Sequence, residues 1–73
     1  DPLTARELEV LQHIAAGESN QKIADKLVIT LSAVKKHTGN IFRKLNVSSR
    51  TQALVRARQL GLLDSDNSSV VER

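Results

Sequence analysis

The chain has 73 residues, no cysteine and a formal net charge of +3, so it can form one small domain but no disulfide and no zinc site with thiolate ligands. Its two histidines, His13 and His37, are isolated, which gives no metal site, and no apolar run approaches the ~20 residues that cross a bilayer. We therefore expect a cytoplasmic protein without cofactor or membrane contact, and no set of side chains that would make an enzyme active site.

The first helix is predicted to begin at Thr4. Thr4 and Glu7 have the spacing of a capping box, in which each side chain binds the backbone amide of the other residue. Leu3 and Leu8 flank this start at the positions of a hydrophobic staple. Apolar residues then recur at helical spacing until Gly17, which can take the left-handed conformation that ends a helix.

A second helix is predicted to start at Ser19 or Asn20, since both residue types cap helix N-termini, and to run to about Leu27. Residues 28–30 would form a short connection to a third helix. This spacing is typical of a helix-turn-helix unit, whose second helix reads the bases of DNA.

The third helix is predicted to be capped by Thr30 or Ser32 and to end near Leu45, where Asn46 can adopt the left-handed conformation. Successive helical residues rotate by about 100°, which places the apolar residues on a face centred on Val34. The opposite face carries basic and amide side chains and one glycine: Ser32, Lys35, Lys36, Gly39, Asn40 and Arg43.

A fourth helix is predicted to begin at Ser49, which would form a second capping box with Gln52, and to stop at Gly61. Residues 64–73 have little to bury, so we expect a disordered tail there. The sequence thus predicts an all-α, four-helix domain of residues 1–63 that contains a helix-turn-helix.

The polar face of the third helix suits the major groove of duplex DNA, which is ~12 Å wide and admits one α-helix. Lysine can donate to guanine and asparagine can pair with adenine, so Lys35, Lys36 and Asn40 are predicted to read bases. Gly39 would let the backbone approach the bases closely, which would offset the roughly 0.8–1 kcal/mol that glycine costs in a helix. The alternative is that Gly39 is merely tolerated.

Positive charge is concentrated in one part of the chain: from Lys26 to Leu63 there are eight lysine or arginine residues and no Asp or Glu. Such a block is expected of a surface that binds a polyanion, although a solvated basic face without a partner would have the same composition. The predicted phosphate contacts are hydroxyl, amide and cationic groups: Ser19, Asn20, Lys22, Thr30, Ser32, Arg43 and Arg50. For Ser19 and Thr30, helix capping alone is the alternative.

Four segments carry a family resemblance. They are Leu3-Thr4-x-Arg6-Glu7-x-Glu9-Val10-Leu11, Ala16-Gly17-x-Ser19-Asn20-x-x-Ile23-Ala24, Val34-Lys35-x-His37-x-x-Asn40-Ile41-x-x-Lys44-Leu45, and Arg50-Thr51-x-Ala53 with Gly61-Leu62-Leu63. Together they resemble the LuxR-type (FixJ/NarL-type) helix-turn-helix domain of bacterial transcription regulators. The agreement extends over residues 3–63, which makes it far more specific than any single motif.

The resemblance implies sequence-specific binding of double-stranded DNA by the C-terminal domain of a regulator, with the third helix in the major groove. A start at Asp1-Pro2 without an initiator methionine fits this expectation of a segment from a larger protein. The fourth helix of the family often mediates dimerisation on a two-fold operator. We therefore expect a homodimer on DNA, with contacts from Ala53, Leu54 and Ala57.

By position, the resemblance places Lys35, Lys36 and Gly39 at the base-facing sites, although Lys35 could equally serve a phosphate. Ala33 stands where the family often has threonine, so a phosphate-binding hydroxyl is missing there. Because Gly39 has no side chain, the question of whether this position contributes to reading the DNA sequence stays open.

Two other functions fit part of the pattern. Region four of a bacterial sigma factor has a similar helix-turn-helix and would add RNA polymerase as a partner, but the fourth helix favours the LuxR-type interpretation. A helical module that binds an acidic protein would explain the charge but not the placement of Gly39 and Asn40. Binding to duplex DNA that weakens steeply with salt would exclude this second alternative.

Overall fold

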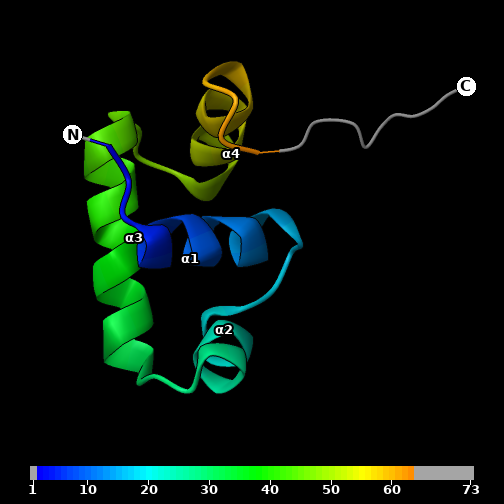
Figure 1. The fold of residues 1–73 in the computed structure, drawn as a ribbon, viewed down its shortest axis with the longest axis vertical. Helices are drawn as coiled ribbons and strands as arrows, with labels where there is room; N and C mark the ends of the chain where they lie inside the picture. The colour runs from blue at the N-terminus through cyan, green and yellow to red at the C-terminus, as the bar shows by residue number, and fades with distance from the viewer. Residues whose placement is uncertain (1, 64–73) are drawn as a thin grey trace, which may run out of the picture.

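The computed structural model describes residues 2–63, which form four helices: α1 (Ala5–Ala15), α2 (Asn20–Leu27), α3 (Leu31–Leu45) and α4 (Arg50–Gln59). The longest helix, α3, stands along one side; α1 crosses its middle, and α2 and α4 lie near its two ends (Figure 1). This arrangement confirms the predicted four-helix fold. No helix within residues 2–63 is long and apolar enough to cross a membrane. The tail predicted at 64–73 lies outside the described residues.

The start of α1 has the predicted capping box. The amide of Glu7 donates to Thr4 Oγ1 over 3.1 Å, and the amide of Thr4 donates to Glu7 Oε1 over 2.9 Å. Two backbone amides that would lack a partner at the helix N-terminus are therefore satisfied. Gly17 follows the end of the helix with a φ of +82°, as predicted.

The structure decides between the alternative caps of the next two helices. Ser19, and not Asn20, caps α2 by accepting from the amide of Lys22 over 3.2 Å. Thr30, and not Ser32, caps α3 by accepting from the amide of residue 33 over 3.0 Å. The first cap lies at the start of α2 and the second at the start of α3, so together they fix where each helix of the helix-turn-helix begins.

The capping box predicted at α4 is half wrong. Ser49 Oγ does accept from the amide of Gln52 over 3.2 Å, but Gln52 Oε1 does not reach back to the amide of Ser49. It accepts instead from the amide and the hydroxyl of Ser48, over 3.0 and 3.1 Å. Ser48 offers two donors where Ser49 would offer one, which explains why the glutamine side chain extends past the cap.

The turn between α2 and α3 contains a feature that the sequence did not predict. Val28 caps the C-terminus of α2 in the left-handed conformation, with φ of 56° and ψ of 49°, and its side chain is 89% exposed. A β-branched residue is strained in this conformation because its Cβ crowds the following carbonyl oxygen. At the end of α3 the same conformation is adopted by Asn46, a residue type that tolerates it.

One core unites the four helices. The apolar face of α3 faces α1 and the other helices, as the rotation of helical residues predicted, and Val34 and Ile41 are fully buried. The buried apolar residues are Val10, Leu11, Ile14, Ile23, Ala24, Val34, Ile41, Leu45, Ala53 and Ala57. Because this core occupies one side of α3 only, the opposite side of the helix remains on the molecular surface.

Candidate nucleic-acid interface

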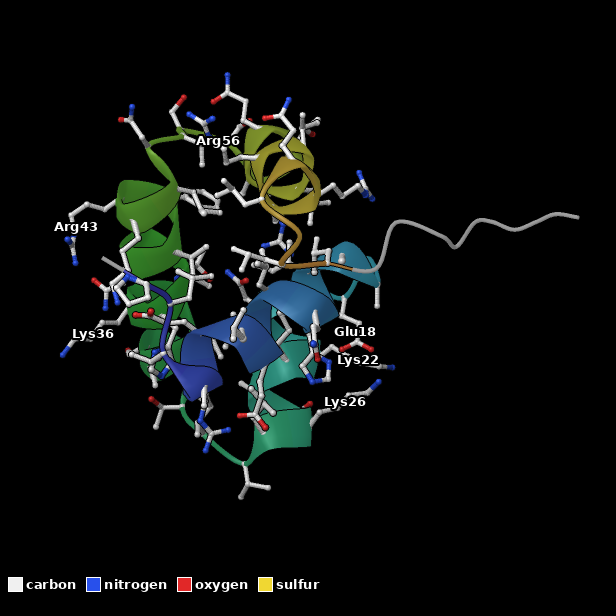
Figure 2. All side chains as sticks on the ribbon, turned by 45° about the horizontal axis from the view of Figure 1, so that its top comes forward. Glu18, Lys22, Lys26, Lys36, Arg43 and Arg56 are labelled. Atoms are coloured by element: carbon white, nitrogen blue, oxygen red, sulfur yellow. The ribbon has the colours of Figure 1, made fainter. Side chains whose placement is uncertain are left out.

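The surface side of α3 is the candidate site, and we call it the outer face. Its exposed residues are Ser32, Lys35, Lys36, Gly39 and Arg43, and the side chain of Asn40 is half-buried beside them. Figure 2 shows Lys36 and Arg43 extending from α3 away from the rest of the molecule. The structure therefore brings together the residues predicted to meet DNA bases, on one helix and on one face.

The chemistry of the outer face favours a polyanion. It carries three cationic side chains, and the whole of α3 contains no Asp or Glu. The guanidinium of Arg43 donates to Asn40 Oδ1 over 3.4 Å, a long contact on the surface. A single helix with such a face has the width and the donor groups that the major groove accepts.

Two exposed hydroxyl groups lie at the start of α3. Thr30 and Ser32 are both exposed, and Thr30 Oγ1 accepts the capping bond from residue 33. Capping is therefore one role of Thr30. A hydroxyl that caps a helix can still donate its own hydrogen to a phosphate oxygen, so the two roles predicted for this residue are compatible.

Arg50 joins α4 to the start of α2. Its guanidinium donates to Asn20 Oδ1 over 3.1 Å and to the backbone carbonyl of Glu18 over 2.9 Å. Both Asn20 and Arg50 were predicted to contact phosphate, and the structure shows that they contact each other. This positioning role was not predicted, because no local pattern connects residues that are 30 positions apart.

Glu18 lies at the centre of a second set of contacts in the same region. Its carboxylate is 2.8 Å from His13 Nδ1 and also accepts from the ammonium of Lys26. The Lys26 hydrogen bond, helped by His13, holds the pKa of Glu18 below its ordinary value although burial acts to raise it. These contacts fix the segment between α1 and α2, immediately before the Ser19 cap.

Lys22 is separated from the outer face of α3. Figure 2 shows Lys22 and Lys26 extending from α2 on the side of the molecule opposite to Lys36 and Arg43. The structure thus does not bring Lys22 together with the residues predicted to read bases. Its phosphate contact stays a prediction.

A largely buried ion pair holds the far end of α3. The Lys44 ammonium lies 2.8 Å from Glu7 Oε1, and the two side chains are 12% and 5% exposed. Burial acts to raise the pKa of Glu7, but the bonds from Lys44 and the Thr4 amide outweigh it, so the pKa lies below its ordinary value. Arg6, the neighbour of Glu7 in the sequence, pairs with Glu9 on the surface.

Two of the three residues predicted for a dimer contact on α4 need correction, and the contact of the third, Leu54, stays a prediction. Ala53 and Ala57 are fully buried in the core of the single chain, because small side chains there let α4 pack closely against the other helices. Leu54 is half-buried and packs against the same core. The apolar side chain that α4 does expose is Val55, at 48%.

Comparison with known proteins identifies relatives. A sequence model of the family described as "Bacterial regulatory proteins, luxR family" matches residues 1–57. The chain is 48% identical over 64 residues to the transcriptional regulatory protein LiaR of Bacillus subtilis (strain 168), an alignment that covers 88% of this chain and 30% of LiaR. It is 51% identical over 61 residues to the response regulator protein VraR of Staphylococcus aureus (strain NCTC 8325 / PS 47), covering 84% of this chain and 29% of VraR. The chain thus spans less than a third of the length of these relatives.

Solved structures show the same fold. The response regulator ChrA of a heme-sensing two-component system superimposes with a TM-score of 0.83 at 44% identity, over 86% of this chain and 31% of ChrA. The transcription factor GerE superimposes with a TM-score of 0.81 at 38% identity, over 88% of this chain and 96% of GerE. The second match shows that the fold accounts for nearly the whole of the GerE chain, so it forms a self-contained domain there.

Proposed function

The chain belongs to the LuxR family of bacterial regulatory proteins, and from this premise we propose that it binds double-stranded DNA sequence-specifically, with α3 in the major groove. It would act in the cytoplasm as the C-terminal, DNA-binding domain of a longer transcription regulator, formed by residues 1–63. The observation that carries the proposal is the outer face of α3. Three exposed cations, an amide and an exposed glycine share this face, while the opposite side of the helix is buried.

In this proposal the parts of the interface have separate tasks. Lys35, Lys36 and Asn40 meet base edges from the outer face of α3, because lysine and asparagine match the donor and acceptor patterns of guanine and adenine. The exposed groups at the helix starts, Ser19 and Thr30, bind phosphates and set the position of the domain along the duplex. Arg50 holds the start of α2 in place for this contact through Asn20 and the Glu18 carbonyl.

The experiment is a selection followed by a substitution. A duplex library with a randomised central segment is enriched on the domain, and affinities for the enriched duplex and a scrambled duplex are then compared. Lys36→Ala should reduce the discrimination between the two by ~1–3 kcal/mol, the value of one good base contact. Equal losses on both duplexes would make Lys36 a phosphate contact.

Lys22→Ala is the matched control for this substitution. Lys22 is also an exposed lysine, but it extends from the opposite side of the molecule (Figure 2). Its removal should leave discrimination unchanged, whether or not it lowers both affinities through loss of charge. Failure of the library to enrich any sequence would contradict sequence-specific binding itself.

We also propose that two domains associate on DNA through α4. Val55, exposed on this helix, supplies an apolar contact that Ala53 and Ala57 cannot. Sedimentation on a duplex with two half-sites should give two domains per duplex for the parent and one for Val55→Asp.

RNA polymerase is a further candidate partner of the regulator. In this proposal DNA covers the outer face of α3, so a contact with RNA polymerase would use another surface of the domain.

A further inference from the structure

Gly39 lies at the centre of the outer face, midway along α3. Lys36 precedes it by three residues and Arg43 follows it by four, so the three positions lie in one row along the helix. Glycine is among the residues least suited to the interior of a helix, and alanine is the best. A glycine at this position therefore needs a reason.

Neither the backbone conformation of Gly39 nor packing within the domain explains the glycine. The glycines with positive φ are Gly17 and Gly61, so Gly39 adopts the ordinary helical conformation that any residue can take. A Cβ built on Gly39 would meet nothing within 4 Å, and the residue is exposed. Alanine would fit here without displacing any atom of the chain.

The fit of α3 into the major groove of DNA would explain why glycine occupies this position. A helix with its side chains is about 10–12 Å across, and the groove is about 12 Å wide, so the side chains at the centre of the inserted face set how deeply the helix lies. The long side chains of Lys36 and Arg43 can bend aside toward bases or phosphates. A Cβ at position 39 is fixed to the backbone and cannot move aside.

We infer that Gly39 is a positioning residue for DNA binding: its missing side chain lets the backbone of α3 lie against the base edges, which brings Lys36 and Asn40 within reach of them. The inference rests on the proposed function. It predicts that one substitution has opposite effects on folding and on binding. Stability rises because the helix is improved, and affinity for the specific duplex falls because the helix is held away from the bases.

The test compares Gly39→Ala and the bulkier Gly39→Gln with the parent. Gly39→Ala should raise the thermal midpoint by about 4–8 °C. It should weaken binding to the enriched duplex by about tenfold, equivalent to one lost base contact, and change binding to the scrambled duplex much less. Gly39→Gln should weaken specific binding further. Gln12→Ala, an exposed substitution in the interior of α1 that also favours helix, should raise the midpoint slightly without changing either affinity.

The possible results distinguish a failure of this inference from a failure of the proposed function on which it rests. If the parent enriches no sequence, the proposed function fails and the inference fails with it. If the parent discriminates but Gly39→Ala binds the enriched duplex as tightly, only the inference is overturned, and Gly39 is merely tolerated. Equal weakening on both duplexes would place position 39 against a phosphate and would overturn the groove assignment. A lower thermal midpoint for Gly39→Ala would show a structural role inside the domain and would contradict the inference as well.

Discussion

The Lys44 ammonium lies 2.8 Å from the carboxylate of Glu7, and this ion pair joins the last turn of α3 to the first turn of α1. Lys44 also donates to the carbonyl of Pro2 over 3.3 Å. Glu7 at the same time completes the capping box with Thr4. One carboxylate therefore fixes both the start of α1 and the orientation of the helix that carries the outer face.

Loss of Lys44 should destabilise the domain strongly. Lys44→Ala leaves the Glu7 carboxylate buried without its cation, which we expect to lower the free energy of unfolding by about 3 kcal/mol in urea denaturation. The control is Arg6→Ala, which removes an exposed ion pair with Glu9 and should cost less than about 1 kcal/mol. Similar, small losses in both variants would mean that burial does not strengthen the Lys44 pair.

The Glu7 carboxylate should also make the free energy of unfolding of the domain depend on pH. Because the pKa of Glu7 in the fold lies below its ordinary value of 4.5, the unfolded chain binds more protons just below that pH. The stabilisation by Glu7 is thus complete above pH 4.5 and is lost as the pH falls through the lower, folded pKa. Glu7→Gln should flatten this decline in the free energy of unfolding. A residual slope from Glu18, whose pKa is also lowered, should remain. An unchanged slope in Glu7→Gln would contradict the assignment.

Val28 should be a site where substitution stabilises the domain. Val28→Asn relieves a left-handed conformation that costs a β-branched residue roughly 1–2 kcal/mol, and it removes a side chain that is 89% exposed. The free energy of unfolding should rise by about 1 kcal/mol. Val55→Asn, at an exposed and ordinary helical position on α4, should give no gain. A loss of stability in Val28→Asn would show that the exposed valine contributes a contact or that the turn is not strained.

Arg50 should act through position rather than through charge. Arg50→Ala removes two hydrogen bonds from a charged group and should cost about 1.5–3 kcal/mol, with faster hydrogen exchange of the amides at the start of α2. Arg50→Lys keeps the charge but not the forked geometry that reaches Asn20 and the Glu18 carbonyl together. It should therefore restore little of the stability. Full recovery of DNA affinity in Arg50→Lys, without recovery of stability, would instead favour a direct phosphate contact.

Much of the fold was predictable because its signals are local. The caps at Thr4 and Ser19, the stop at Gly17 and the two faces of α3 depend on residues within one or two helical turns of each other. Side-chain type and spacing decide such features. The half-wrong capping box at Ser49 shows the limit of this reasoning, since a neighbouring serine offered the glutamine a better set of donors.

The contacts that position the candidate site were not predictable in this way. The Lys44–Glu7 pair spans 37 positions and the Arg50–Asn20 contact spans 30, and many basic residues could have filled either role. The burial of Ala53 follows from how closely α4 packs on its neighbours, which its own sequence does not reveal. The left-handed Val28 likewise follows from the geometry of the turn, against the preference of the residue.

The central claim is that the outer face of α3 lies in the major groove, and an amide NMR titration with the enriched duplex at two salt concentrations tests it most directly. We predict shifts concentrated at Ser19, Thr30 and residues 32–43, which shrink as salt rises because the basic surface displaces counterions from the DNA. Shifts confined to α4, or an outer face without shifts at low salt, would contradict the account and would assign the basic surface of α3 to a partner other than DNA.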